Sequence, residues 1–215
     1  MDSFDDLLRQ AELAHGHLCA GQILGVRLAM LGCQRLGISE PRTTDRRRLV
    51  TFIEIDRCAT DAIAVVTGCR LGKRALKFRD WGKMAATFVD LASPLTDLNA
   101  APGPLADTTP TYKGIRIAAL ESSKQRAREL YPHIEHKNQQ QMLAYRNLPD
   151  SDLFAEQWVR VPLHPREMPG YKSPRIACAL CGEGINYDRN ATTPTGEILC
   201  QSCAAPEARY YLPLP

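Results

Sequence analysis

The sequence predicts an α+β protein in which a mixed or antiparallel sheet packs with helices and a small four-cysteine zinc-binding tail follows. Apolar residues recur at helical spacing near the N-terminus, and β-branched apolar runs recur between residues 49 and 120, so both kinds of element are expected. Two Cys-x-x-Cys pairs stand near the C-terminus. A chain of 215 residues suits one substantial domain and one small module. We expect an α+β core domain over residues 1–165 and a linker with a zinc ribbon or zinc finger over residues 166–215.

Two helices are expected at the start of the chain. Ser3 and the acidic residues after it resemble a capping box, and apolar residues follow at helical spacing, which predicts a helix over residues 4–14. Further apolar positions predict a longer second helix, which Gly37 would end in the C′ position. The stretch HGHLCAG, residues 15–21, therefore lies at the N-terminus of the second helix.

The other elements of the core are predicted from β-branched runs and from prolines and glycines. Residues 49–55 are apolar and β-branched enough for a buried strand. A segment rich in proline and glycine, residues 99–107, is expected to be a surface loop. Residues 164–174 carry three prolines and are expected to lead into the tail. The remaining predictions are a short helix over 61–67, strands over 74–79, 84–91, 114–120 and 154–163, and a helical region over 121–146 with a break at Pro132.

The spacing of four cysteines is the strongest signal in the sequence. The pair Cys178 and Cys181 is separated from the pair Cys200 and Cys203 by eighteen residues, a spacing that places four thiolates tetrahedrally around one zinc ion. A module of this size buries little apolar area, so the metal would provide much of its folding free energy. Because four thiolates leave no position for a substrate, we interpret this zinc as structural. A docking surface for protein or nucleic acid is the alternative.

Two of the five histidines, His15 and His17, lie within four residues of Cys19. The free N–H groups and the dipole of a helix N-terminus stabilise a thiolate there, which favours ionisation of Cys19. We predict a core metal site with His15, His17, Cys19 and Cys58 as ligands, because imidazole and thiolate suit zinc or another borderline-soft ion. In the alternative interpretation the histidines only cap and hydrogen-bond at the helix start, and the cysteines are small buried hydrophobes.

A third interpretation gives the same residues a catalytic role. Cys19 would be a nucleophile with His17 or His15 as its base, which requires the two side chains to lie within hydrogen-bond reach. Cys58 or Cys69 would alternatively pair with Cys19 as a redox dithiol. The spacing in the sequence leaves these interpretations open.

Three further features of the sequence give weaker evidence about function. They are Lys73, Cys33 and the arginines at 46–48. Lys73 is expected to hold an anionic substrate at the cleft, although the glycines around it do not form a phosphate-binding loop. Cys33 stands among apolar residues of the second helix and is expected in the core. The three arginines precede a strand, where such residues more often form a solvated edge than a nucleic-acid surface.

Two long motifs and the terminal cysteine pairs resemble a known family. HGHLCAGQILGVRLA and EIDRCATDAIAVVTGCRLGKRALKFRDWGKMAATF resemble the FmdE family, which is named after a component of molybdenum formylmethanofuran dehydrogenase, over roughly residues 10–205. The tail also resembles a TraR/DksA-type zinc finger. The resemblance implies an α+β core with a cleft built by the two motifs, a zinc-binding tail and a homodimer. The family often has proline after the first cysteine, where this chain has Ala20, and this change is expected to leave the ligands intact.

Composition and charge limit the remaining function classes. With 44% hydrophobic and 24% charged residues the chain is typical of a globular protein, and no apolar run approaches the roughly 18 residues of a membrane span. The N-terminus MDSFDDLLRQ is acidic and lacks the pattern of a secretory signal, so a cytoplasmic protein is expected. Its eight cysteines then favour metal binding over disulfides. A net charge of +3 gives no reason to expect a nucleic-acid partner.

Two functions remain open at this point. One is a metal-binding protein with zinc in the tail, a second metal ion in the core, and a His/Cys-lined cleft with an enzymatic or redox role on a small molecule. The other is a non-catalytic accessory or regulatory module that docks through its zinc finger on a larger oxidoreductase complex or on nucleic acid. Catalysis by formylmethanofuran dehydrogenase is attributed to other components of that enzyme, so the resemblance assigns no reaction to this chain.

Overall fold

The computed structural model of the protein describes residues 1–95 and 109–212. The chain forms two compact units, Met1–His164 and Pro165–Pro215. A sheet with its helices makes up the first unit, and four cysteines lie in the second. The predicted α+β class with a four-cysteine tail is confirmed. The loop expected over residues 99–107 lies outside the described residues.

Five strands form the sheet of the first unit, in the order β2-β1-β3-β4-β5. β1 and β2 are parallel and are joined through a helix, as a parallel crossover requires. The other three pairings are antiparallel, so the sheet is mixed. The strands are β1 (Leu49–Ile53), β2 (Leu76–Phe78), β3 (Ala85–Pro94), β4 (Thr111–Ala119) and β5 (Phe154–Pro162).

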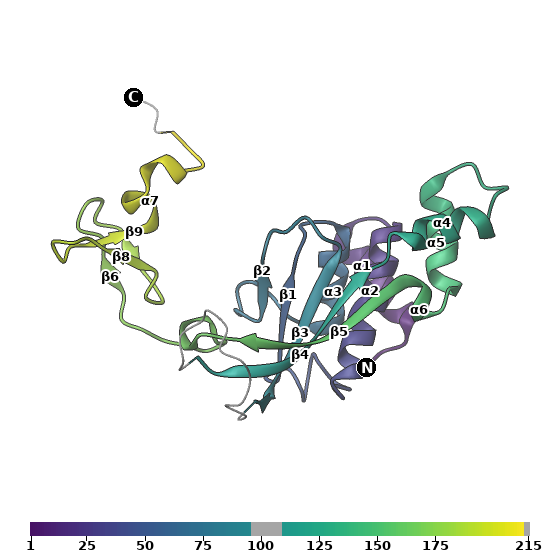
Figure 1. Cartoon of the computed structure of the whole chain (residues 1–215), viewed down its shortest axis with the longest axis horizontal. Helices are drawn as coiled ribbons and strands as arrows, with labels where there is room; N and C mark the ends of the chain where they lie inside the picture. Colours follow the sequence, from purple (N-terminus) through teal and green to yellow (C-terminus); the bar gives the residue numbers. More distant parts are fainter. Residues whose placement is uncertain (96–108, 213–215) are drawn as a thin grey trace. The chain divides into compact units, whose positions relative to one another are not determined.

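Helices pack on this sheet and beside it. α2 and α3 contact its strands, α1 packs against α2 and α3, and α4 and α5 lie to the side (Figure 1). α1 begins after Ser3, whose side-chain oxygen accepts a hydrogen bond from the Asp6 N–H at 3.2 Å, as the capping box predicts. The helices are α1 (Phe4–His15), α2 (Ala20–Arg35), α3 (Cys58–Thr67), α4 (Ser122–Leu130), α5 (Lys137–Asn147) and α6 (Asp150–Leu153).

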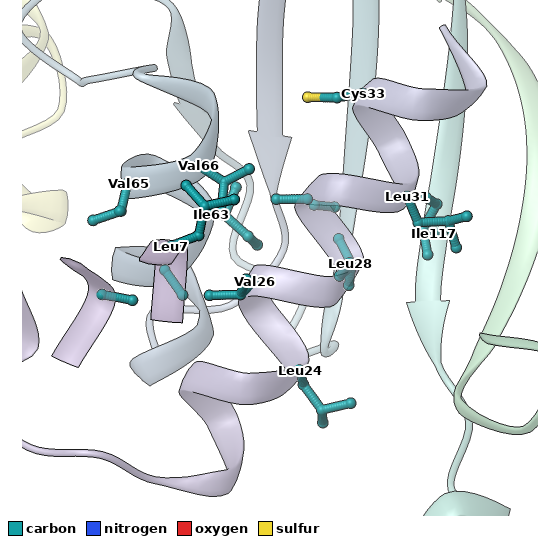
Figure 2. Packing of buried hydrophobic residues seen from close by; sticks show 14 of the residues in the cluster. Leu7, Leu24, Val26, Leu28, Leu31, Cys33, Ile63, Val65, Val66 and Ile117 are labelled. Carbon is teal, nitrogen blue, oxygen red and sulfur yellow. The ribbon is translucent and has the colours of Figure 1, made fainter. Parts of the chain in front are cut away.

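α2 is the central helix of the core. In Figure 2 its residues Leu28 and Leu31 face Ile117 of β4, while Leu7 of α1 and Ile63 of α3 lie on the other side of the helix. All five side chains are buried. Burying side chains of this size stabilises the fold by about 1.5–3 kcal/mol each, before the loss of chain entropy is counted.

Two glycines let α2 approach its neighbours closely. A Cβ atom on Gly25 would lie 2.5 Å from the carbonyl oxygen of Ala59 in α3, and one on Gly32 would lie 2.3 Å from the ring of Phe88 in β3. Distances this short are not tolerated, so a side chain at either position would push the elements apart. The close contact at Gly25 brings the N-termini of α2 and α3 together.

One observed helix boundary differs from the prediction. α3 begins at Cys58 and not at residue 61, because Arg57 is extended and the Thr60 hydroxyl donates to the carbonyl of Ile55 at 2.7 Å. Cys58 is therefore a helical residue and not a loop residue. The helical region expected over 121–146 is divided between α4 and α5, with Pro132 in the connection.

The second unit consists of two small hairpins and a short helix. β6 (Ile176–Ala177) pairs with β7 (Gly184–Ile185), and β8 (Asn190–Thr192) pairs with β9 (Ile198–Cys200), both antiparallel. α7 (Gln201–Ala204) follows β9. In the described parts of both units, no helix is long and apolar enough to cross a membrane.

Candidate metal sites and pocket

Four cysteines of the second unit converge on one point. The Sγ atoms of Cys178, Cys181, Cys200 and Cys203 all lie within 4.8 Å of one another. The first two are carried by the turn between β6 and β7, where Gly182 adopts a φ of +76°, a conformation that glycine accepts without strain. The second two come from the end of β9 and from α7.

Hydrogen-bond donors favour the thiolate form of Cys178 and Cys200, whereas the hydrogen bond with Cys200 raises the pKa of Cys203 to about 12. The N–H groups of Cys181 and Cys200 donate to the sulfur of Cys178, the latter at 3.3 Å, and they lower the pKa of Cys178 to about 6. The Ser202 hydroxyl lies 3.3 Å from the sulfur of Cys200 and lowers the pKa of that thiol. Thiolate is the form of cysteine that binds metal ions. The four-cysteine cluster therefore identifies the chain as a metal-binding protein.

A second cluster joins the end of α1 to the start of α2. His15 is the last residue of α1, Gly16 ends that helix with a φ of +93°, and Cys19 is the N-cap residue of α2. One ligand atom each of His15, His17 and Cys19 lies within 4.8 Å of the other two. The two imidazole rings have their centroids 4.7 Å apart. The tight turn at Gly16 thus folds the two histidines back toward the cysteine.

The two ring nitrogens of His15 have different surroundings. Nδ1 lies 2.8 Å from Oδ2 of Asp61, which is on α3. Nε2 is buried and has no hydrogen-bond partner among the described residues. A histidine that ligates a metal through one nitrogen usually has the other held by a carboxylate. The environment of His15, together with the adjacent His17 and Cys19, fits a bound metal ion.

Cys58 begins α3 and lies next to Cys19. Desolvation and the hydrogen bond with Cys19 raise the pKa of the Cys58 thiol. Gly21 makes this approach possible, because a Cβ atom there would lie 3.1 Å from Cβ of Cys58 and 3.6 Å from Sγ of Cys19. Both thiols therefore lie at a helix N-terminus, one on α2 and one on α3.

A pocket of about 450 Å³ opens beside the two thiols. Part of its wall is apolar, with Leu24 and Met84, and part is charged, with Arg57 and Lys124. α5 closes another side, where the amide oxygen of Asn138 accepts a hydrogen bond from the Ala20 N–H at 3.2 Å. A pocket of this size and mixed lining is typical of small-molecule sites.

Cys69 and Lys73 are not brought to this pocket. Cys69 follows the opposite end of α3, is 3% exposed and contacts Thr51 with its sulfur at 3.5 Å. The ten residues of α3 separate it from Cys58 by about 15 Å along the helix. Lys73 is exposed in the turn that follows Cys69 and does not line the pocket. Lys73 therefore lies beyond the end of α3 that is opposite to the pocket, and its role at the cleft stays a prediction.

Cys33 lies in the core, as expected. It is fully buried, and burial raises the pKa of its thiol to about 12.

Sequence reasoning missed several residues of the site. No local pattern connects Asp61 with His15, which is 46 positions away. Sequence reasoning assigned no function to Asn138, Lys124 or Tyr145, all of which line the pocket. Their segment was expected only as helix, and no local pattern in it indicates a ligand.

Relatives of known name and structure cover both parts of the chain. A probable S-adenosyl-L-methionine-binding protein of Archaeoglobus fulgidus is 37% identical over 84 residues, which are 39% of this chain and 23% of that protein. The chain thus spans only about a quarter of that relative's length. The crystal structure of a tungsten formylmethanofuran dehydrogenase FmdE-like protein from Syntrophus aciditrophicus superposes with a TM-score of 0.57 at 18% identity, over 98% of this chain and 96% of that one. At this identity the likeness establishes the fold.

The family comparison is more specific than either relative. The model for FmdE, described as molybdenum formylmethanofuran dehydrogenase operon, matches residues 14–155. This span contains the histidine and cysteine cluster, Cys58 and the pocket, and it ends before the tail, so the TraR/DksA resemblance of the tail stays a prediction. Because the match covers more than half of the chain, the protein belongs to the FmdE family.

Proposed function

We propose that the protein holds a metal ion between His15, His17 and Cys19, in addition to a zinc ion in the tail, and acts on a small molecule in the adjoining pocket. The observation that carries this proposal is the buried Nε2 of His15, which lacks a partner among the described residues while Nδ1 is held by Asp61. A buried polar atom without a partner is costly, and a metal bond would remove that cost.

The donor set supports an open site. Two imidazoles and one thiolate supply three ligands, which is the number that catalytic zinc sites take from the protein. A metal ion held in this way can polarise a carbonyl group or activate water. Cys58 lines the pocket beside Cys19 and would contact a molecule bound there. In the tail, four thiolates match closed structural zinc.

Two further features of the proposal rest on relatives alone. The description of the family names a formylmethanofuran dehydrogenase operon, and this supports a larger oxidoreductase complex as a partner. The expected state of the chain itself is a homodimer. The name of the Archaeoglobus relative makes S-adenosyl-L-methionine one molecule to test against the pocket.

Metal content per chain, measured by mass spectrometry on the anaerobically purified full chain, tests the proposal. We expect two metal ions in the wild type and one in each of His17→Ala and Cys181→Ser. His133→Ala, an exposed histidine in the connection between α4 and α5, is the matched control and should keep both. If the wild type holds a single metal ion that only Cys181→Ser removes, the core site is absent and the accessory function becomes the better explanation.

A further inference from the structure

The pocket beside Cys19 and Cys58 carries an excess of positive charge. Its lining includes the basic residues Lys124 and Arg57 and the acid Glu121. Lys124 and Glu121 form an ion pair of 2.7 Å, so their charges largely cancel. Arg57 is exposed and has no ion-pair partner among the described residues. Its guanidinium is therefore free to bind an anion that enters the pocket.

A helix N-terminus adds a backbone donor to the pocket. Cys19, which precedes α2, does not cap its helix with a side-chain hydrogen bond. Gly21 lines the pocket, and in the described part of the chain its N–H group has no acceptor. A Cβ atom on Gly21 would lie 3.1 Å from Cβ of Cys58, which also lines the pocket, so only glycine at this position leaves room beside Cys58.

The rest of the pocket is suited to an apolar group. Leu24, Met84 and Leu120 line it. An anion with a hydrocarbon part matches both halves of the lining, whereas inorganic phosphate would leave the apolar half unused.

We propose that this pocket binds a small organic acid, with its carboxylate at Arg57 and the N–H group of Gly21, and its apolar part against Leu24 and Met84. This names the substrate class of the proposed function and rests on it for the chemistry, although acid binding itself is measurable without that chemistry. The carboxylate would then lie beside Cys19 and Cys58.

Amide chemical shifts of the full-length protein, titrated with butanoate and separately with butanamide, test this inference. We expect butanoate to shift the amide signal of Gly21, and butanamide to bind at least about tenfold more weakly because it lacks the charge. Arg57→Gln should weaken butanoate binding about fivefold and Gly21→Ala about tenfold. Arg47→Gln and Gly72→Ala are matched controls, because both positions are exposed and a Cβ on Gly72 meets no atom within 4 Å.

Three results would overturn the inference: no butanoate-specific shift at Gly21, equal affinity for butanamide, or loss of binding in His17→Ala but not in Gly21→Ala. The last result would place the carboxylate on the core metal. Failure of butanoate to bind a protein with two metal ions leaves the proposed function standing. Butanoate binding by a protein with one metal ion leaves this inference standing and removes the proposed core metal.

Discussion

His15 and Asp61 are joined by a contact of 2.8 Å between Nδ1 and Oδ2, and this contact links the end of α1 to the first turn of α3. It holds one ring nitrogen of His15, while the other, Nε2, is buried and has no hydrogen-bond partner among the described residues. The same carboxylate would make Nε2 a stronger metal ligand, because it supports positive charge on the ring.

Removal of this carboxylate should weaken the core metal site. Asp61→Ala is expected to lower the affinity of that site about 10- to 100-fold, measured by competition with a chelator, and to leave the tail site unchanged. Asp61→Asn keeps an oxygen acceptor and should have a smaller effect. Asp56→Ala, an exposed aspartate in the preceding loop, is the control. Unchanged core affinity in Asp61→Ala would show that His15 is not a ligand.

The two metal sites should respond separately to loss of a cysteine. Cys181→Ser removes one of four converging thiolates, and because a module of this size depends on its metal to fold, the tail should lose protection from hydrogen exchange. The strands of the first unit should keep theirs. Cys19→Ser should lose the core metal and keep the tail metal, and both units should retain their protection from hydrogen exchange. Equal loss of protection throughout the chain in both variants would contradict separate roles.

The close contact between α2 and α3 should not tolerate a methyl group. Gly25→Ala places a Cβ atom 2.5 Å from a backbone oxygen and 2.8 Å from a backbone carbon of Ala59, and backbone atoms cannot move aside as a flexible side chain does. The free energy of unfolding in urea is expected to fall by about 1–3 kcal/mol. Gly72→Ala, in open space, should change it by less than about 1 kcal/mol. Equal stability of the two variants would show that α2 and α3 can separate without cost.

The ion pair between Asp90 and Arg48 should give the fold a pH dependence. Burial opposes ionisation of Asp90, but hydrogen bonds from Arg48 at 2.9 Å, from the Ala92 N–H and from Ser93 outweigh it and lower the pKa of the carboxyl. A lowered folded-state pKa contributes stability above the unfolded value, about pH 3.9, and this contribution is lost as the pH falls through the folded value.

Asp90→Asn tests this dependence. The variant should lose about 2 kcal/mol at pH 7, and the difference from the wild type should shrink as the pH is lowered below about 4. Urea unfolding at both pH values provides the measurement. A difference that grows with acidity would contradict the assignment, because it would mean that the pKa of Asp90 is raised in the folded protein.

Local patterns predicted most elements of the core because each depends on neighbouring residues. The capping residue Ser3 and the apolar spacing after it are enough to start α1. β1 begins at residue 49 as its β-branched run indicates, although it ends at Ile53. The start of α3 at Cys58 was missed, since it depends on the bond of Thr60 to the preceding loop and not on periodicity.

The sequence by itself determined the α+β class, the four-cysteine tail, and the grouping of His15, His17 and Cys19 within one short turn. These features are local, because spacing along the chain sets which side chains can meet. Only the tertiary structure decided that Asp61 holds His15, that Cys58 joins Cys19 while Cys69 does not, and that α5 closes the pocket through Asn138. Each of these contacts depends on helices packed by apolar burial and by the close approach at Gly25, and helix packing of this kind is not encoded in any single segment.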